Sequence, residues 1–112
     1  MRRNLAIVLF ALLTLISKPA LGDAGWTDFG YVTELTSTNQ FHYLVTLNIS
    51  DNPSDCRNKH TFYQDFSMSG SSQMFRILLE AVKTGQRVRV YVTGNCEING
   101  YSEISSVSII PR

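Results

Sequence analysis

The chain has 112 residues, with ten basic and nine acidic side chains and a formal net charge of +1. This length predicts one small domain. Nucleic-acid binding is disfavoured because it relies on clustered Lys and Arg that neutralise phosphates, and no run of like charge indicates a membrane-binding patch.

The first 22 residues have the features of a secretory signal peptide. Two arginines precede an apolar run over residues 5–16, and the small residues Ala20 and Gly22 follow. A membrane span needs about 20 apolar residues, so this run is too short for one. We therefore expect cleavage after Gly22, export to the periplasm or the medium, and one mature domain over residues 23–112. That domain keeps seven basic and nine acidic residues, a formal charge of −2.

Two strands are predicted at the start of the mature domain. Residues 28–35, DFGYVTEL, are rich in strand formers. Residues 41–50 alternate more strictly, and the polar segment TSTNQ between the two indicates a turn that pairs them antiparallel. The apolar face of the second strand comprises Tyr43, Val45, Leu47 and Ile49.

A polar loop and a third strand come next. The loop, residues 51–60, reads DNPSDCRNKH and contains Cys56. Residues 61–68 place polar side chains such as Gln64 between Phe62 and Phe66, the pattern of a half-buried strand.

An amphipathic helix is predicted between Ser71 or Ser72, either of which could cap its first turn, and Gly85, which favours a helix end. A helix of this length would close one end of a small barrel. Its expected core face comprises Met74, Ile77, Leu78, Ala81 and Val82.

Two further strands end the chain. Residues 87–92, RVRVYV, alternate between an inner and an outer face, whereas residues 103–110 change phase by one residue between Ile104 and Val107, which indicates a bulge. The order β-β-β-α-β-β in about 90 residues is that of an OB-fold, a five-stranded partly open barrel. The inner face of the fourth strand comprises Val88, Val90 and Val92, and its outer face Arg87, Arg89 and Tyr91.

Cys56 and Cys96 are the only cysteines, and we expect them to form a disulfide in an oxidising compartment. Closing a loop of about 41 residues would stabilise the fold by roughly 4 kcal/mol. A metal site or a reactive thiol is the alternative, but no CxxC spacing is present, and His42 and His60 do not fall at ligand spacing.

The block LLEAVKTGQRVRVYVTGNCEINGYSEISSVSIIP, residues 78–111, resembles the end of a family of small exported bacterial proteins. More distantly, it resembles the B subunits of toxins of the pertussis-like and subtilase-cytotoxin type. Those subunits are OB-folds that form pentameric rings and bind sialylated glycans. The resemblance implies a carbohydrate-binding protein that forms homo-oligomers.

No catalytic motif is present: the sequence lacks GxSxG, HExxH and a phosphate-binding Gly-rich loop. His42 and His60 are interpreted as ordinary surface or hydrogen-bonded residues. Asp51 and Asp55 share a loop, but without the spacing and the glycine of a calcium site. We therefore predict a protein that is not an enzyme and has no cofactor or metal.

The predicted disulfide would hold two polar loops together and so create a candidate ligand site. Amides, charged groups and an aromatic ring suit sugar hydroxyls and apolar sugar faces, although solvated loops are polar for simpler reasons. The candidate residues are Asp55, Arg57, Asn58, Lys59, Asn95, Asn99 and Tyr101.

Trp26 and the outer face of the fourth predicted strand each allow two interpretations. We expect Trp26 to pack across a barrel end, with sugar stacking as its alternative role. The outer stripe of Arg87, Arg89 and Tyr91 fits a subunit interface better than nucleic acid. Two functions follow: an exported glycan-binding or protein-binding module related to toxin B subunits, or a stand-alone periplasmic or secreted protein acting through protein contacts.

Overall fold

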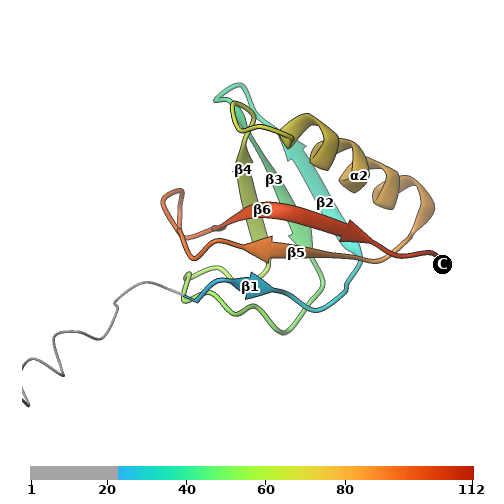
Figure 1. Cartoon of the computed structure of the whole chain (residues 1–112), viewed down its shortest axis with the longest axis horizontal. Coiled ribbons are helices and arrows are strands. Elements are labelled where there is room, and N and C mark those ends of the chain that lie inside the picture. Colours follow the sequence, from blue (N-terminus) through green and yellow to red (C-terminus); the bar gives the residue numbers. More distant parts are fainter. Residues whose placement is uncertain (1–22) are drawn as a thin grey trace, which may run out of the picture.

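A computed structural model describes residues 23–112, and the predicted signal peptide lies outside the described residues. The fold is mainly β with one helix, as the sequence predicts (Figure 1). The elements are β1 (Gly25–Trp26), β2 (Val32–Ser37), β3 (His42–Leu47), β4 (Thr61–Asp65), α2 (Ser71–Thr84), β5 (Val88–Val92) and β6 (Ser102–Ile109).

The strands form one sheet in the order β1-β5-β6-β4-β3-β2. All neighbours are antiparallel except β4 and β6, which run parallel. In Figure 1, β2, β3 and β4 run steeply, and β5, β6 and β1 cross them. The sheet is therefore strongly curved, and its concave side encloses the core.

The segment between β1 and β2 links the two ends of the sheet. Gly30 and Val88 exchange backbone hydrogen bonds of 2.8 and 2.9 Å, whereas the carbonyl of the next residue, Tyr31, accepts one from Asn48 N–H at 3.1 Å. Two consecutive residues thus bond to different parts of the sheet, Gly30 to β5 and Tyr31 to the residue that follows β3. The predicted continuous strand over residues 28–35 is wrong, because the chain changes partner here and the sheet has six strands instead of five.

Gly30 permits this change of partner by its small size. A Cβ atom at this position would lie 2.5 Å from Ile49 Cγ2 and 3.0 Å from Asn48 Oδ1. Real Cβ atoms do not approach other atoms so closely, so the segment following β3 could not pack against any larger residue here without moving.

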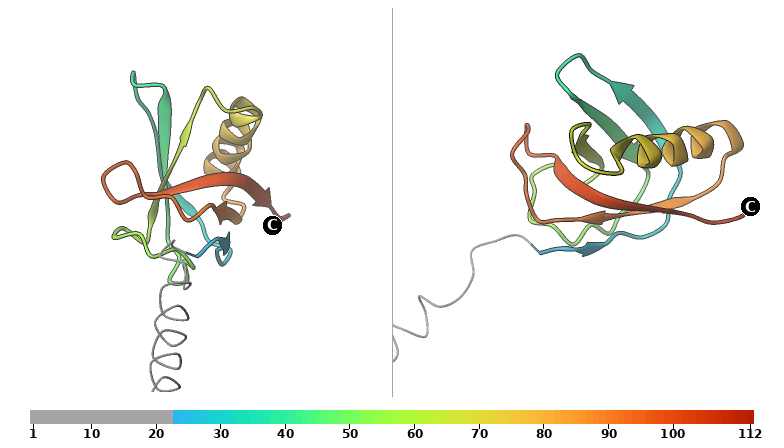
Figure 2. Two further views of the ribbon diagram at one scale, coloured as in Figure 1. Left: turned by 60° about the vertical axis from the view of Figure 1, so that its left-hand side comes forward. Right: turned by 45° about the horizontal axis from the view of Figure 1, so that its top comes forward.

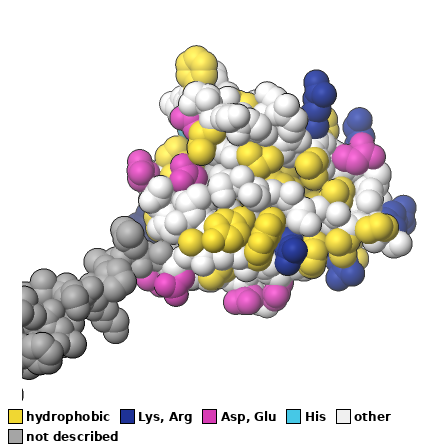
Figure 3. Space-filling view, in the orientation of Figure 1, with side chains coloured by type: hydrophobic (Ala, Val, Ile, Leu, Met, Phe, Trp, Pro, Cys, Tyr) yellow, Lys and Arg dark blue, Asp and Glu magenta, His cyan; other side chains and the backbone are white. Residues whose placement is uncertain are grey.

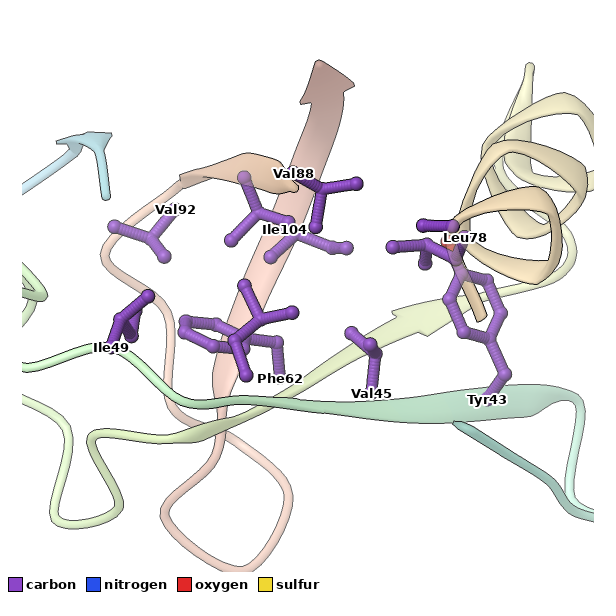
Figure 4. Close-up of a cluster of buried hydrophobic side chains, with 11 residues drawn as sticks. Tyr43, Val45, Ile49, Phe62, Leu78, Val88, Val92 and Ile104 are labelled. Atoms are coloured by element: carbon purple, nitrogen blue, oxygen red, sulfur yellow. The ribbon is translucent and has the colours of Figure 1, made fainter. Parts of the chain in front are cut away.

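The core lies between the crossing layers (Figure 4). The alternation predicted for the second and fourth strands is confirmed, because their apolar faces are buried. Burying one such side chain completely contributes about 1.5–3 kcal/mol. The buried cluster comprises Tyr43, Val45, Leu47, Ile49, Phe62, Leu78, Ala81, Val88, Val90, Val92 and Ile104.

The bulge predicted in the last strand is also confirmed. Tyr91 pairs with Ser106, whereas Val92 pairs with Ile104, so Ser105 is the extra residue on β6. The bulge lets both Ile104 and Val107 pack on the core despite their spacing of three.

β4 is buried on both faces, which differs from the predicted half-buried strand. Phe62 and Gln64 are fully buried on one side, and Tyr63 is 4% exposed on the other. β4 lies inside the sheet between β3 and β6. The Gln64 amide hydrogen-bonds to the Tyr43 hydroxyl and to the carbonyl of Ile104, which permits its burial. The hydrophobic pattern of the sequence does not indicate that this polar residue is buried.

The start of α2 differs from the prediction. The helix follows Gly70, which has a left-handed φ of 84° and offers no side chain for a cap. Ser71 points the other way and donates its hydroxyl proton to the carbonyl of Phe66 at 2.8 Å. The end agrees with the prediction, since Gly85 is left-handed and its N–H donates to the carbonyl of Ala81 at 2.9 Å.

The helix covers one end of the core, where it packs against β2 and β6 (Figure 2). Leu78 and Ala81 are buried as predicted, but Val82 is 48% exposed. Phe75 takes part in its place, with its ring 5.1 Å from that of Tyr43 and 5.6 Å from that of Phe66. The apolar stripe of α2 is therefore rotated from the predicted one.

Candidate functional site

The predicted disulfide between Cys56 and Cys96 is present, with the two Cα atoms 5.5 Å apart. Beside it, Asn58 N–H donates to the carbonyl of Gly100 at 3.0 Å. The Arg57 side chain packs so closely on Gly100 that a Cβ there would lie 2.9 Å from its Nε. The structure thus brings the two predicted loops together into one unit, here called the loop pair (residues 51–60 and 93–101).

Several polar groups of the loop pair serve its own architecture. Asn58 Oδ1 accepts from the backbone N–H groups of His60 at 2.9 Å and Thr61 at 2.8 Å. Lys59 donates from its ammonium to the carbonyl of Ser54, and Asn95 Nδ2 donates to Glu103 Oε1 at 3.0 Å. These three predicted ligand residues hold the loops in shape, which reduces what they can offer a ligand.

A buried pair of hydroxyls lies beneath the loops, and sequence reasoning missed it. Ser54 Oγ and Ser102 Oγ are 2.7 Å apart, and both residues are buried. Asn52 Nδ2 donates to Ser102 Oγ at 3.3 Å and to the carbonyl of Lys59 at 3.1 Å. The sequence does not distinguish a buried serine in a loop from an exposed one, so it could not predict this buried pair.

Four of the seven predicted residues remain as candidates for external contacts. Asp55, Arg57 and Asn99 are exposed, and Tyr101 is half-buried. Asn99 lies in the tip with a left-handed φ of 49°, a conformation that asparagine tolerates. A ligand at the loop pair stays a prediction based on these four side chains.

The outer face of β5 carries a second cluster. Trp26 of β1 pairs with Tyr91 of β5, and their rings meet edge to face with centroids 5.5 Å apart. The guanidinium carbon of Arg89 lies 4.4 Å from the Trp26 ring centroid and 5.0 Å from that of Phe29. We call these four residues the aromatic–arginine face.

This cluster corrects the expectation for Trp26, which does not pack across an end of the fold. Its ring is 39% exposed on the outer surface. In Figure 3, hydrophobic side chains gather over β5 and β1 beside basic ones. The cause lies in register: Trp26 is opposite Tyr91, and Tyr91 points outward because its neighbours Val90 and Val92 point into the core.

Stacking fixes the position of Arg89. Each cation–π contact contributes about 0.5–2 kcal/mol, depending on desolvation. Arg89 Nε is buried and has no hydrogen-bond partner in residues 23–112, so the guanidinium can hydrogen-bond only through its terminal nitrogens. Ser106 and Ser108 of β6 stand opposite Tyr91 and Arg89 in the register and add hydroxyl groups to the same face.

Two concave surfaces adjoin these elements. A hollow of about 540 Å³ lies beside the outer face of β5 and is lined by Tyr31, Gly85, Gln86, Arg87, Pro111 and Arg112. A groove of about 350 Å³ runs between β2 and α2, and its apolar lining comprises Val32, Leu35, Phe75, Leu79 and Val82.

The shifted pKa values belong to groups outside the hollow and the groove. Burial raises the pKa of Tyr43, and burial together with the nearby Glu103 carboxylate raises that of Tyr63. Hydrogen bonds from Ser67 lower the pKa of Asp65. Over residues 23–112 no group of three or more His, Cys, Asp or Glu side chains is placed to hold a metal ion, and no helix is long and apolar enough to cross a membrane.

Comparisons of the chain with protein-family models, with curated proteins and with solved structures found no match.

Proposed function

We propose that this chain is an exported, non-enzymatic binding domain that recognises a glycan through the aromatic–arginine face. The observation that carries the proposal is Trp26, a residue that is 39% exposed although its ring contacts both Arg89 and Tyr91. An exposed aromatic ring offers an apolar surface to the C–H face of a sugar. Arg89 and the hydroxyls of Ser106 and Ser108 offer donors and acceptors to sugar hydroxyls.

The rigidity of this face supports the proposal. Its members project from paired strands, where backbone hydrogen bonds fix their positions, and Arg89 is held further by two rings. A ligand therefore meets side chains that have already lost much of their freedom, which lowers the entropic cost of binding. The loop pair offers less, because Asn58, Lys59 and Asn95 are engaged internally.

We further propose that the fold is an OB-fold, related to the toxin B subunits that the sequence resembles. The order β2-β3-β4-β6-β5 with one parallel pair, β4 and β6, fits a Greek-key barrel, and α2 lies between β4 and β5 in the chain. In this interpretation β1 is the detached start of the first barrel strand, separated from β2 at Gly30.

A glycan array probed with the disulfide-bonded protein tests the binding proposal. Hits are then titrated by fluorescence, because Trp26 is the only tryptophan and its emission reports on this face alone. We expect a saturable change in emission, and we expect Arg89→Ala to weaken binding while the fold persists by circular dichroism. Because loss of Arg89 alters the fluorophore's surroundings, affinities of variants are compared by calorimetry.

Variants in the loop pair serve as matched controls. Arg57→Ala removes an exposed arginine from the other candidate site and should leave affinity unchanged. Loss of binding in Arg57→Ala with retention in Arg89→Ala would move the glycan site to the loop pair. Absence of any glycan hit would remove the proposal.

A specific observation favours protein contacts as a second candidate function. The groove between β2 and α2 is mainly apolar, although Thr33, Glu34 and Ser37 also line it, and Leu79 and Val82 are 39% and 48% exposed. β2 is the last strand in the sheet order, so one of its edges has no strand partner among the described residues. A second copy of the chain is the occupant that the resemblance to ring-forming B subunits favours.

Light scattering over a range of protein concentrations tests this second candidate. We expect a multiple of the monomer mass for the unmodified protein and a monomer for Val82→Glu, with Lys83→Glu as a neighbouring control on α2 that keeps the oligomer. A monomer at every concentration would exclude self-association through the groove.

A further inference from the structure

We propose that the hollow beside the outer face of β5 binds a tetrahedral oxyanion, such as a phosphate or a sulfate group. The hollow measures about 540 Å³ and is lined by Tyr31, Gly85, Gln86, Arg87, Pro111 and Arg112. This site lies beyond the proposed glycan face and does not depend on it.

The charge of the lining points to an anion. Arg87 and Arg112 both line the hollow, and neither Asp nor Glu does. Arginine is also the side chain whose planar set of donors best matches the oxygens of a phosphate or sulfate group.

Neutral donors complete the lining. Tyr31 is 49% exposed, so its hydroxyl is accessible to a ligand. Gly30 and Val88 pair in an antiparallel bridge. In such a bridge Tyr31, the residue after Gly30, lies opposite Arg87, the residue before Val88. A phenol and a guanidinium from two different segments thus border the same hollow.

Hydrogen bonds hold three of the residues that line the hollow. Gln86 Nε2 donates to the carbonyl of Ile110 at 3.1 Å, and Ile110 N–H donates to the carbonyl of Arg87 at 3.1 Å. On the other side, Tyr31 N–H donates to Asn48 Oδ1 at 2.7 Å. The backbone at Tyr31 and Arg87 and the amide of Gln86 are therefore already held when an anion enters, which reduces the cost of binding.

Arg87, the residue before β5, and Arg89 of β5 differ in their environments although they are only two residues apart. Arg89 is stacked on Trp26 and Phe29 and has lost the use of Nε. Arg87 is exposed and lines the hollow, so its guanidinium is accessible to a ligand there. The oxyanion site is therefore assigned to Arg87 and Arg112, and Arg89 is left to the aromatic–arginine face.

A nuclear magnetic resonance titration of the ¹⁵N-labelled, disulfide-bonded protein tests this site. Sodium phosphate and sodium sulfate are added at constant ionic strength maintained with sodium chloride. We expect saturable shifts of the backbone signals of Tyr31, Gln86 and Arg87. Equal shifts with chloride alone, or shifts spread over the whole surface, would overturn the proposal because they indicate screening without a site.

Variants of equal charge change make the test specific. Arg87→Gln should lower the affinity for phosphate about tenfold, as expected for the loss of a hydrogen bond to a charged group. Arg76→Gln removes an exposed arginine from α2, outside the hollow lining, and should leave the affinity unchanged. Equal affinities of the two variants would contradict the assignment.

Inorganic phosphate and glucose 6-phosphate distinguish the source of the oxyanion, with glucose as the uncharged control. Tighter binding of the ester supports a site for the charged group of a larger ligand, and tighter binding of inorganic phosphate supports a site for the free ion. Shifts with glucose equal to those with its phosphate would remove the oxyanion site. Trp26→Phe should leave phosphate affinity unchanged, which separates this result from failure of the glycan proposal.

Discussion

The hydroxyl of Tyr43 donates a 2.9 Å hydrogen bond to Gln64 Oε1, and neither residue exposes any surface. The two residues are cross-strand partners on β3 and β4, and Gln64 Nε2 continues the chain of contacts to the carbonyl of Ile104 on β6 at 3.0 Å. Three strands are thereby tied by polar contacts inside an otherwise apolar core. Such a buried network is favourable only while every member keeps its partner.

Tyr43→Phe should lower the free energy of unfolding by about 1–3 kcal/mol, because it leaves Gln64 Oε1 buried without a donor. Urea unfolding followed by circular dichroism measures the change. Tyr91→Phe is the matched control: its ring lies on the outer face, and the same loss of a hydroxyl there should cost less than about 0.5 kcal/mol. Equal effects of the two substitutions would show that the buried hydrogen bond contributes nothing.

Gly30→Ala should destabilise the fold by about 1–3 kcal/mol, since the added methyl group would lie 2.5 Å from Ile49 Cγ2 at the closure of the sheet. Thermal unfolding gives the first measurement. The double variant Gly30→Ala/Ile49→Ala removes the methyl that is overlapped and should lose less stability than the sum of the two single variants. Simple additivity would argue against the steric explanation.

Cys56→Ser should lower the melting temperature by more than about 10 °C, because the disulfide is worth roughly 4 kcal/mol and a domain of this size loses about 4 to 8 °C per kcal/mol. The Cys56→Ser/Cys96→Ser variant should melt at a similar temperature, which excludes an effect of the unpaired thiol. A melting curve identical to that of the unmodified protein would contradict a stabilising role.

Stability should fall as the pH rises through about 10, the ordinary pKa of tyrosine. Burial raises the pKa of both Tyr43 and Tyr63 in the folded protein, with Glu103 adding to the effect at Tyr63. The unfolded chain therefore loses these protons first, and ionisation favours unfolding. The urea midpoint of unfolding should decrease between pH 8 and 11, and it should decrease less steeply for Tyr63→Phe than for the unmodified protein. Equal slopes of midpoint against pH for the two proteins would exclude a contribution from Tyr63.

The parts of the fold that depend on near neighbours in the chain could be predicted. Alternation along 41–50 and 87–92 placed the valines of both strands in the core because a strand has a two-residue period. Gly85 ended the helix as expected. The disulfide could be predicted since only two cysteines exist to form it.

Features that depend on distant partners could not be predicted. Gly30 breaks the first strand because of Val88 and Ile49, far along the chain, and Gln64 is buried because β6 supplies a carbonyl. At the candidate site, the proximity of the two loops followed from the cysteines. The hydrogen bonds of Asn58 within the loop and the contact between Trp26 and Arg89 depend on strand register, so the sequence could not predict them.

The pairing of β1 with β5 also sets when the fold can form. Gly25 and Trp26 pair with Val92 and Tyr91, and β6 lies between β5 and β4 in the sheet. A chain made from its N-terminus cannot complete this sheet until β6 has been synthesised, and contacts across so long a separation form late. The sheet order thus makes completion of the fold depend on β6, the last strand of the described residues.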